Sequence, residues 1–215
     1  MEITMYINKY RNARWLFYKW RYELAIVHKL LLALGFACLT GVLAQARFYL
    51  PWSPVPITGQ TFAILLSGVL LGVWGGVSQM MYLGIGAAGI PWFAGGNAGL
   101  AYLTGPTGGY LIGFVIAAFF LGYCVDRYIK SRNFITLFGL MLFANIVFVY
   151  GLGLLQLYGW LTLIKGSTVG LTELLIMGMI PFLIGDIIKI GLAATIAHGL
   201  TPKQSYAKEL DATRI

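Results

Sequence analysis

The sequence is poor in charged residues, which occupy only 10% of its 215 positions, whereas 59% of the positions are hydrophobic. A soluble domain usually carries about 25% charged residues, so this composition excludes an ordinary soluble enzyme or binding module. Glycine is abundant, with 28 residues, as is common in membrane helices that pack closely. The composition therefore predicts a membrane protein with no room for a soluble catalytic domain.

Residues that commonly carry out catalysis are also scarce. The only histidines, His28 and His198, stand near the ends of apolar segments, and Cys38 and Cys124 belong to no disulfide or metal-binding pattern. The motifs H-E-x-x-H, G-x-S-x-G and G-x-x-x-x-G-K-[ST] do not occur, so the sequence indicates no zinc protease, α/β-hydrolase or P-loop ATPase. We therefore expect no enzyme activity, no metal and no cofactor, and any energy input must come from an ion gradient or another subunit.

Apolar segments dominate the chain and predict an all-α integral membrane protein. Its membrane domain, residues 29–199, is expected to be a bundle of six transmembrane helices at about 30–49, 60–73, 77–89, 110–125, 134–157 and 174–198. The second and third segments are shorter than the roughly 20 residues that a helix perpendicular to the bilayer needs, so we expect them to pack against the others. The intervening proline-rich and glycine-rich stretches, at 51–58 and 90–109, are predicted loops.

The regions that flank the membrane domain are polar. Residues 1–28 mix lysine and arginine with tryptophan and tyrosine, which is typical of a segment at the membrane interface, although a flexible arm is the alternative. Residues 200–215 are expected to form a cytoplasmic tail. The A-x-A pattern at 44–46 resembles a signal-peptidase site, but the stretch before its apolar run is too long for a signal peptide, and we expect no cleavage.

The positive charges are distributed unevenly along the chain. Of the 15 lysines and arginines, six precede the first apolar segment, three lie at 126–133 and three in the tail, whereas the opposite side of the predicted bundle has only Arg47 and Lys165. This asymmetry predicts that both termini are cytoplasmic and that the loops at 50–59, 90–106 and 158–173 face outward. The net charge of +8 therefore indicates orientation in the membrane and not binding to nucleic acid.

Two ionisable residues, Asp186 and Lys189, interrupt the last apolar segment. In a helix they share a face because they are three positions apart. An ionisable group in hydrocarbon costs at least about 2.5–3.5 kcal/mol, so an acid and a base in one span indicate a functional site. The alternative is a structural ion pair between helices.

A small-molecule pocket needs a few convergent polar groups and mostly apolar walls. Further polar candidates stand at segment edges and in loops: Thr58, Gln60, Asn97 and Tyr110. The aromatic candidates for the walls are Trp92, Phe93 and Tyr102. The alternative for the asparagine is a turn residue beside a glycine, and the alternative for the aromatics is anchoring at the lipid interface.

Small residues recur at four-residue spacing in three stripes: Ala33, Ala37 and Gly41; Gly68, Gly72 and Gly76; Gly105, Gly109 and Gly113. Such stripes let helices approach closely. Internal packing is the default explanation for all three. The first stripe has a second interpretation, in which it faces a partner subunit.

Four motifs together resemble the BioY family, the biotin-specific substrate-binding (S) component of energy-coupling factor transporters. They are Val55-Pro-Ile-Thr-Gly-Gln-Thr61, Tyr82-Leu-Gly-Ile-Gly-Ala-Ala-Gly-Ile-Pro-Trp-Phe93, Gly105-Pro-Thr-Gly-Gly-Tyr-Leu-Ile-Gly-Phe114 and Gly185-Asp-Ile-Ile-Lys189. The resemblance covers about residues 30–200 and implies a six-helix bundle in the plasma membrane that binds biotin near its outer side. It also implies a transmembrane coupling (T) component and two cytoplasmic ATPases as partners.

Carried over by motif, the resemblance implies that Asp186, Lys189 and Asn97 are polar ligands of biotin, and that the Ala33-x-x-x-Ala37 pattern is the docking face for the T component. Biotin's ureido ring has two N–H donors, which suit Asp186, and one carbonyl acceptor, which suits Lys189 or the Asn97 amide. Lys189 could instead pair with the carboxylate of biotin. The function expected is high-affinity biotin capture for uptake. The alternatives are an S component for another vitamin and a non-transporting membrane scaffold.

Overall fold

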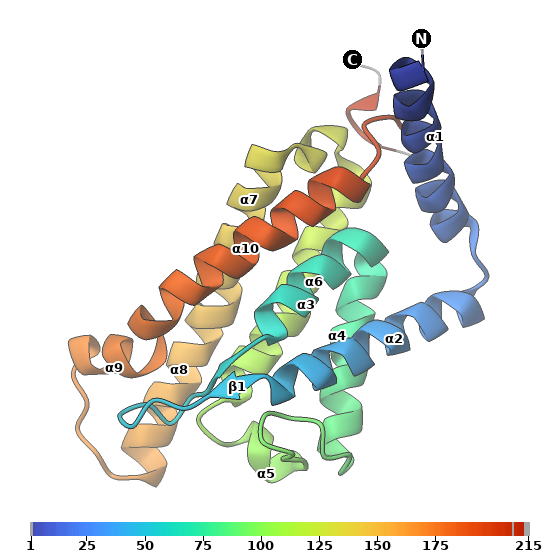
Figure 1. Ribbon diagram of the computed structural model, residues 1–215. Helices are drawn as coiled ribbons and strands as arrows, with labels where there is room; N and C mark the ends of the chain where they lie inside the picture. The colour runs from blue at the N-terminus through green and yellow to red at the C-terminus, as the bar shows by residue number, and fades with distance from the viewer. Residues whose placement is uncertain (1, 208, 213–215) are drawn as a thin grey trace.

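The computed structural model describes residues 2–207 and 209–212 and is mostly helical (Figure 1). Its elements, in chain order, are α1 (Glu2–Glu23), α2 (Ile26–Gln45), β1 (Arg47–Phe48), β2 (Ile57–Thr58), α3 (Gln60–Leu71), α4 (Val73–Ala87), α5 (Leu100–Leu103), α6 (Gly108–Arg127), the 3₁₀ turn η1 (Ile129–Arg132), α7 (Phe134–Phe143), the π-helical segments η2 (Ala144–Tyr150) and η3 (Trp160–Ile164) on either side of α8 (Gly151–Gly159), α9 (Leu171–Gly178) and α10 (Ile180–Leu200). The two short strands pair antiparallel.

Helices occupy most of each of the six expected apolar segments, although the first helix ends at Gln45 and not near residue 49. Within the described residues, four helical stretches are long and apolar enough to cross a membrane: α2, α6, the continuous stretch 134–164 and α10. Helices α3 and α4 have only 12 and 15 residues, as the short second and third segments predicted. The fifth segment is longer than expected, because helix continues through η3 to Ile164.

The sixth segment is not one helix, and the expectation of an uninterrupted helix over 174–198 was wrong. Helix α9 ends at Gly178, and Met179 leaves the helical conformation with φ −141° and ψ −58° before α10 begins. Pro181 stands in the first turn of α10, where its missing N–H removes no helical hydrogen bond. The chain therefore changes direction at Met179, immediately before α10, the helix that carries Asp186.

Helix α6 lies at the centre of the fold and packs against α3, α4, η2 and α8. Two of its glycines explain how closely these helices approach. A Cβ atom at Gly113 would lie 2.4 Å from the Phe148 carbonyl oxygen, and one at Gly109 would lie 2.2 Å from the Leu152 carbonyl oxygen. Backbone therefore lies against backbone at this crossing, and the predicted packing role of these two glycines is confirmed.

The first small-residue stripe also lies inside the fold. Ala33 and Ala37 are 0% exposed and Gly41 is buried against the ring of Trp92, because this face of α2 packs on α3 and α4. The exposed face of α2 carries other residues, among them Leu31 and Val42. The chain itself thus covers the stripe, and the packing alternative is the one that this structure displays.

The basic arm is helical and lies across the end of the bundle at which α10 ends (Figure 1). Tyr18 is 0% exposed and donates a hydrogen bond to the Val69 carbonyl. The indole of Trp15 donates to the Ser205 carbonyl at 2.7 Å. The Tyr10 hydroxyl donates to the Gly199 carbonyl at 2.7 Å, so the arm is docked on the bundle from Tyr10 onward. Its outward side exposes large apolar residues: Met5, Tyr6, Leu16, Phe17 and Trp20.

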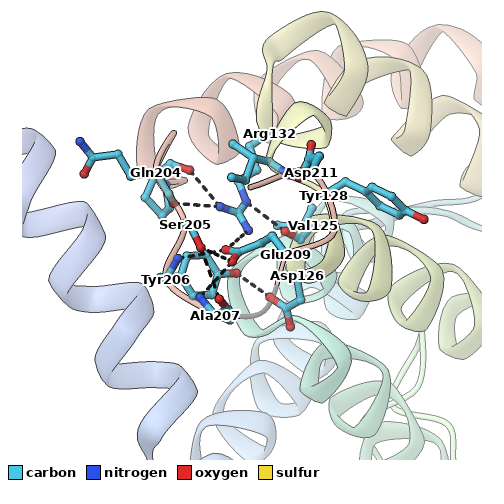
Figure 2. Close-up of polar contacts among 12 residues, drawn as sticks. Val125, Asp126, Tyr128, Arg132, Gln204, Ser205, Tyr206, Ala207, Glu209 and Asp211 are labelled. Atoms are coloured by element: carbon cyan, nitrogen blue, oxygen red, sulfur yellow. Dashed lines mark hydrogen bonds and ion pairs between the residues drawn. The ribbon is translucent and has the colours of Figure 1, made fainter. Parts of the chain in front are cut away.

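A buried arginine fastens the tail to the same end of the bundle (Figure 2). The Arg132 side chain is 0% exposed and its guanidinium donates to Glu209 Oε1 at 2.8 Å and to the Val125 carbonyl at 3.0 Å. It also donates to carbonyl oxygens of the tail, those of Pro202 and Gln204. We call Arg132, Glu209 and the carbonyls that Arg132 binds the tail clasp.

Two further acidic residues, Asp211 and Asp126, form polar contacts at this end of the bundle. The Asp211 carboxylate accepts the backbone N–H groups of Ile129 and Lys130 at 2.7 and 2.9 Å. Asp126 forms an ion pair with Arg21 of α1 and accepts the Tyr206 hydroxyl at 2.7 Å. Burial would raise the pKa of Glu209, but hydrogen bonds from Ser205 and Arg132 outweigh it and lower that pKa to about 2.

Candidate functional site

A cavity lies between the ends of α3, α6, η2 and α10 and beneath the loops that follow α2 and α4. Its empty volume is about 540 Å³ with the open space at its mouth included, and the centre of a water-sized sphere can occupy about 60 Å³ of it. Its apolar lining residues are Val55, Pro56, Ile57, Ala94, Leu111, Phe114, Val149 and Phe182. Its polar and tyrosine lining residues are Thr58, Gln60, Thr61, Tyr102, Thr107, Tyr110, Tyr150, Asp186 and Lys189.

The predicted charged pair lines this cavity. Lys189 Nζ lies 2.9 Å from Asp186 Oδ1, one helical turn away on α10. Asp186 is only 5% exposed, whereas the Lys189 side chain is 20% exposed. The two residues share one face of the helix, as predicted, and form an ion pair in which Lys189 is the more accessible member.

The second oxygen of Asp186 is held by two residues that the sequence analysis missed. The Asn145 amide donates to Asp186 Oδ2 at 2.8 Å, and the Tyr150 hydroxyl donates to the same atom at 2.7 Å. Both donors come from the π-helical segment η2. Asn145 had a signal in the sequence, because an amide within an apolar span requires a polar partner. Tyr150 had none.

The predicted residues Thr58 and Gln60 form a short chain of hydrogen bonds along the cavity wall. The Thr58 hydroxyl donates to Gln60 Oε1 at 2.9 Å, and Gln60 Nε2 donates to the Tyr82 hydroxyl at 2.9 Å. Tyr82 donates in turn to the Trp92 carbonyl. These bonds fix the Gln60 amide, which keeps one N–H and one lone pair free of them for a ligand.

Two predicted aromatic residues line the cavity by different means. The Tyr110 hydroxyl donates to the carbonyl of Gly178 at 2.8 Å, which fastens α6 to the turn between α9 and α10. Tyr102 stacks on Phe93, with ring centroids 5.1 Å apart. Phe93 is itself 0% exposed and is not among the residues that line the cavity, so its role there is to support the Tyr102 ring by stacking.

Asn97 and Trp92 also lie outside the cavity lining. The Asn97 amide donates to the Ala94 carbonyl at 2.7 Å, beside Gly95 and Gly96, whose φ angles are positive. This is the turn geometry that the sequence analysis gave as the alternative for Asn97. Asn97 lines a neighbouring surface hollow, which shares Pro56, Tyr102 and Thr107 with the main cavity. The Trp92 indole N–H is bound to the Tyr82 carbonyl.

One fully buried polar group of the cavity lining has no hydrogen-bond partner in the described part of the chain. This group is the Thr107 hydroxyl, which is buried at the start of α6 and lines the cavity. A buried hydroxyl without a partner is costly, so it favours occupation of the cavity by a molecule with a polar group. Thr107 is thus a further candidate ligand contact that the sequence analysis did not single out.

The polar groups of this site are suited to the recognition of a small molecule. Its strongest polar feature combines a carboxylate that accepts hydrogen bonds with an ammonium that donates them, and most of the remaining wall is apolar. Among the described residues there is no group of three or more histidines, cysteines and acids that could hold a metal ion. Such a cavity suits a small molecule that has one polar end and an apolar body.

Membrane-length helices around a largely apolar cavity with a charged pair in its wall define a membrane protein that binds a small solute. The chain belongs to the BioY family, whose model matches residues 13–205. The match spans the membrane domain and half of the basic arm. The resemblance that the four motifs indicated is therefore confirmed.

Named relatives and a solved structure agree with this assignment. The chain is 49% identical over 147 residues to a probable biotin transporter BioY of Methanothermobacter thermautotrophicus, covering 68% of this chain and 94% of the relative. It is 39% identical over 168 residues to a probable biotin transporter BioY of Pyrococcus horikoshii, covering 77% and 91%. The fold matches the crystal structure of the S-component for biotin from an ECF-type ABC transporter with a TM-score of 0.71 and 27% identity, covering 82% of this chain and 94% of that chain. These relatives are transporters and not enzymes.

Proposed function

We propose that this protein is the biotin-binding membrane subunit of a vitamin uptake transporter. In this role it captures biotin with high affinity, and partner ATPases energise uptake through a transmembrane coupling component. Family membership and the names of the relatives support the ligand and the partners. Nothing in the sequence supplies a nucleotide-binding loop, so ATP hydrolysis belongs to the partners.

The observation that carries the proposal is the Asp186–Lys189 pair in the wall of an apolar cavity. The ureido ring of biotin carries N–H donors for the carboxylate and a carbonyl acceptor for the ammonium. The thioether ring and aliphatic chain suit the apolar lining. A cavity that pairs each polar atom of its ligand rejects analogues lacking those atoms by orders of magnitude. Thr58, Gln60, Tyr102 and Tyr110 contribute further wall, and Asn97, Trp92 and Phe93 support it from outside the lining.

We also propose six membrane crossings, with α3 and α4 as short crossings and both termini on the cytoplasmic side of the plasma membrane. The four long apolar stretches and the two short helices support this number. Most lysines and arginines flank one end of the bundle, where α1 and the tail lie, which supports the orientation. The loops that border the cavity, together with α5, lie at the opposite end (Figure 1), so the cavity opens outward.

The outward side of α1 supports a place at the cytoplasmic membrane surface. Leu16, Phe17 and Trp20 are exposed on α1, and the same helix carries the exposed cations Lys9 and Arg11, a combination that favours a lipid interface. Ala33 and Ala37 are covered by other parts of this chain, so they are not available as a docking face for the coupling component in this structure. We propose that the coupling component docks on the exposed surface of the bundle.

Isothermal titration of the purified protein with biotin tests the proposal. We expect one biotin per chain, and we expect Lys189→Ala to weaken binding by at least about tenfold, because a hydrogen bond to a charged group contributes about 1.5–3 kcal/mol. The matched control is Lys165→Ala, since Lys165 lies against Trp160 outside the cavity, and it should bind biotin as the parent does.

The same titration separates the competing functions. Binding of thiamine, riboflavin or niacin in place of biotin would assign the cavity to another vitamin. A protein that binds none of these, and that only loses stability when Lys189 is replaced, would instead be a scaffold with a structural ion pair. Unchanged biotin affinity in Lys189→Ala would overturn the proposed site.

A further inference from the structure

The two donors to Asp186 Oδ2 are five positions apart in the sequence, Asn145 and Tyr150. In an α-helix each residue advances about 100° around the axis, so two residues five apart lie about 140° apart and face different directions. An α-helical Asn145 and Tyr150 could not both reach a single carboxylate oxygen on a neighbouring helix. The observed contacts therefore need another backbone geometry.

The backbone between these residues supplies that geometry. Residues Ala144–Tyr150 form a π-helix, in which hydrogen bonds join residues five apart and the wider turn places such residues nearly above one another. Asn145 and Tyr150 thus come to the same face, toward α10. Both are buried, with 1% and 3% of their surface exposed, so their donor groups need an acceptor, which Asp186 supplies. Asn145 Oδ1 has no hydrogen-bond partner among the described residues.

The contacts also fix how much of the carboxylate a ligand can use. An ionised carboxylate has about four lone-pair positions, two on each oxygen. Asn145 and Tyr150 occupy those of Oδ2, and Lys189 occupies one of those of Oδ1. One position on Oδ1 therefore stays open. Two of the three N–H bonds of Lys189 stay open as well, because the described residues give its ammonium no second partner.

We propose that the π-helical segment η2 is a positioning device, in which Asn145 and Tyr150 hold the Asp186 carboxylate so that it presents a single acceptor position, on Oδ1, to the ligand. This inference rests on the proposed function, and it narrows the set of contacts that biotin can make: Asp186 accepts one N–H of the ureido ring, not both. The second N–H must then find another acceptor in the wall.

A double-mutant cycle tests the inference with biotin as the probe. Tyr150→Phe removes one hydroxyl and keeps the ring, so the carboxylate gains rotational freedom and an extra acceptor position. We expect biotin affinity to fall about tenfold in this variant, on the scale of the lost hydrogen bond to a charged group. In an Asp186→Asn background the same substitution should change affinity less than twofold, because Tyr150 acts through the carboxylate.

The control is Tyr158→Phe on α8, an exposed tyrosine outside the cavity lining, which should bind biotin as the parent does. Thermal unfolding of Tyr150→Phe monitors folding, and Asn145→Ala serves as a second variant if the first is unstable. Equal losses in both backgrounds, or no loss in the parent background, would overturn the positioning role. Failure of the parent protein to bind biotin would overturn the proposed function instead, so the two failures are distinguishable.

Discussion

Replacing Glu209 by glutamine should destabilise the protein strongly, although Glu209 lies far from the cavity. The substitution keeps the size of the side chain and removes its charge, which leaves the buried guanidinium of Arg132 without a counter-ion. Both side chains of this pair are 0% exposed. Removing one partner of such a buried pair costs about 3–5 kcal/mol.

The structure places the expected loss at the lower end of that range. Arg132 keeps its hydrogen bonds to the carbonyls of Val125 and Gln204, and the glutamine oxygen can still accept one from the guanidinium. We therefore expect the free energy of unfolding to fall by about 3 kcal/mol. Denaturant or thermal unfolding in detergent, followed by circular dichroism, measures it.

A matched substitution separates burial from charge alone. Glu23→Gln removes an equivalent charge from an exposed pair, in which Glu23 and Lys19 lie 3.9 Å apart on α1. Exposed pairs of this kind contribute about 0–1 kcal/mol. Equal effects of Glu23→Gln and Glu209→Gln would refute the argument that burial makes the tail clasp stabilising.

The pH dependence gives an independent check of the tail clasp. The pKa of Glu209 is lowered in the folded protein, from 4.5 to about 2, so its ionised form is the one that folding favours. Its contribution is present above pH 4.5 and is lost as the pH falls through about 2. Unfolding curves of the parent should therefore lose stability over this window by more than those of Glu209→Gln.

Two further predictions concern helix packing. Gly113→Val should sharply reduce the yield of folded protein, because its Cβ would lie 2.4 Å from the Phe148 carbonyl oxygen. A Cβ at Gly84 meets no atom within 4 Å, so the control Gly84→Ala should fold normally. Size-exclusion chromatography of the extracted proteins compares the two yields. Ala37→Leu should lower the free energy of unfolding by about 1–3 kcal/mol through overpacking, and should reduce biotin binding and uptake together. Loss of uptake in Ala37→Leu with parent stability and binding would instead assign that face of α2 to a partner.

The sequence predicted the helices and the charged pair well, because both depend on local information. Runs of apolar residues define helices in a membrane, and residues three apart share a face whatever the tertiary structure. For the same reason the contacts of Asn145 and Tyr150 were missed, since residues five apart share no face of an α-helix. The turn at Met179 was missed as well. Pro181 is compatible with the first turn of a new helix and also with a kink inside a longer one, and the apolar sequence around it does not distinguish the two.

Loop residues were the least predictable part of the site. Asn97 was a candidate ligand by its polarity and motif, but its amide is bound within its own turn. The sequence could state both alternatives and could not choose, because the choice depends on which way the glycine-flanked backbone turns. The tail clasp was beyond prediction for a different reason: Arg132 and Glu209 are 77 residues apart, and nothing in either local sequence indicates the other.

That separation has a consequence for biosynthesis. The ribosome makes Arg132 77 residues before Glu209, and Arg21 105 residues before Asp126. Each arginine is therefore synthesised while its acid does not yet exist, and is an uncompensated cation as the neighbouring segments insert. In the proposed topology these positive charges keep the chain segments around them on the cytoplasmic side. Once the acids have been synthesised, the same guanidinium groups pair with them and become buried. Residues that orient the nascent chain thus later hold α1 and the tail to the end of the folded bundle.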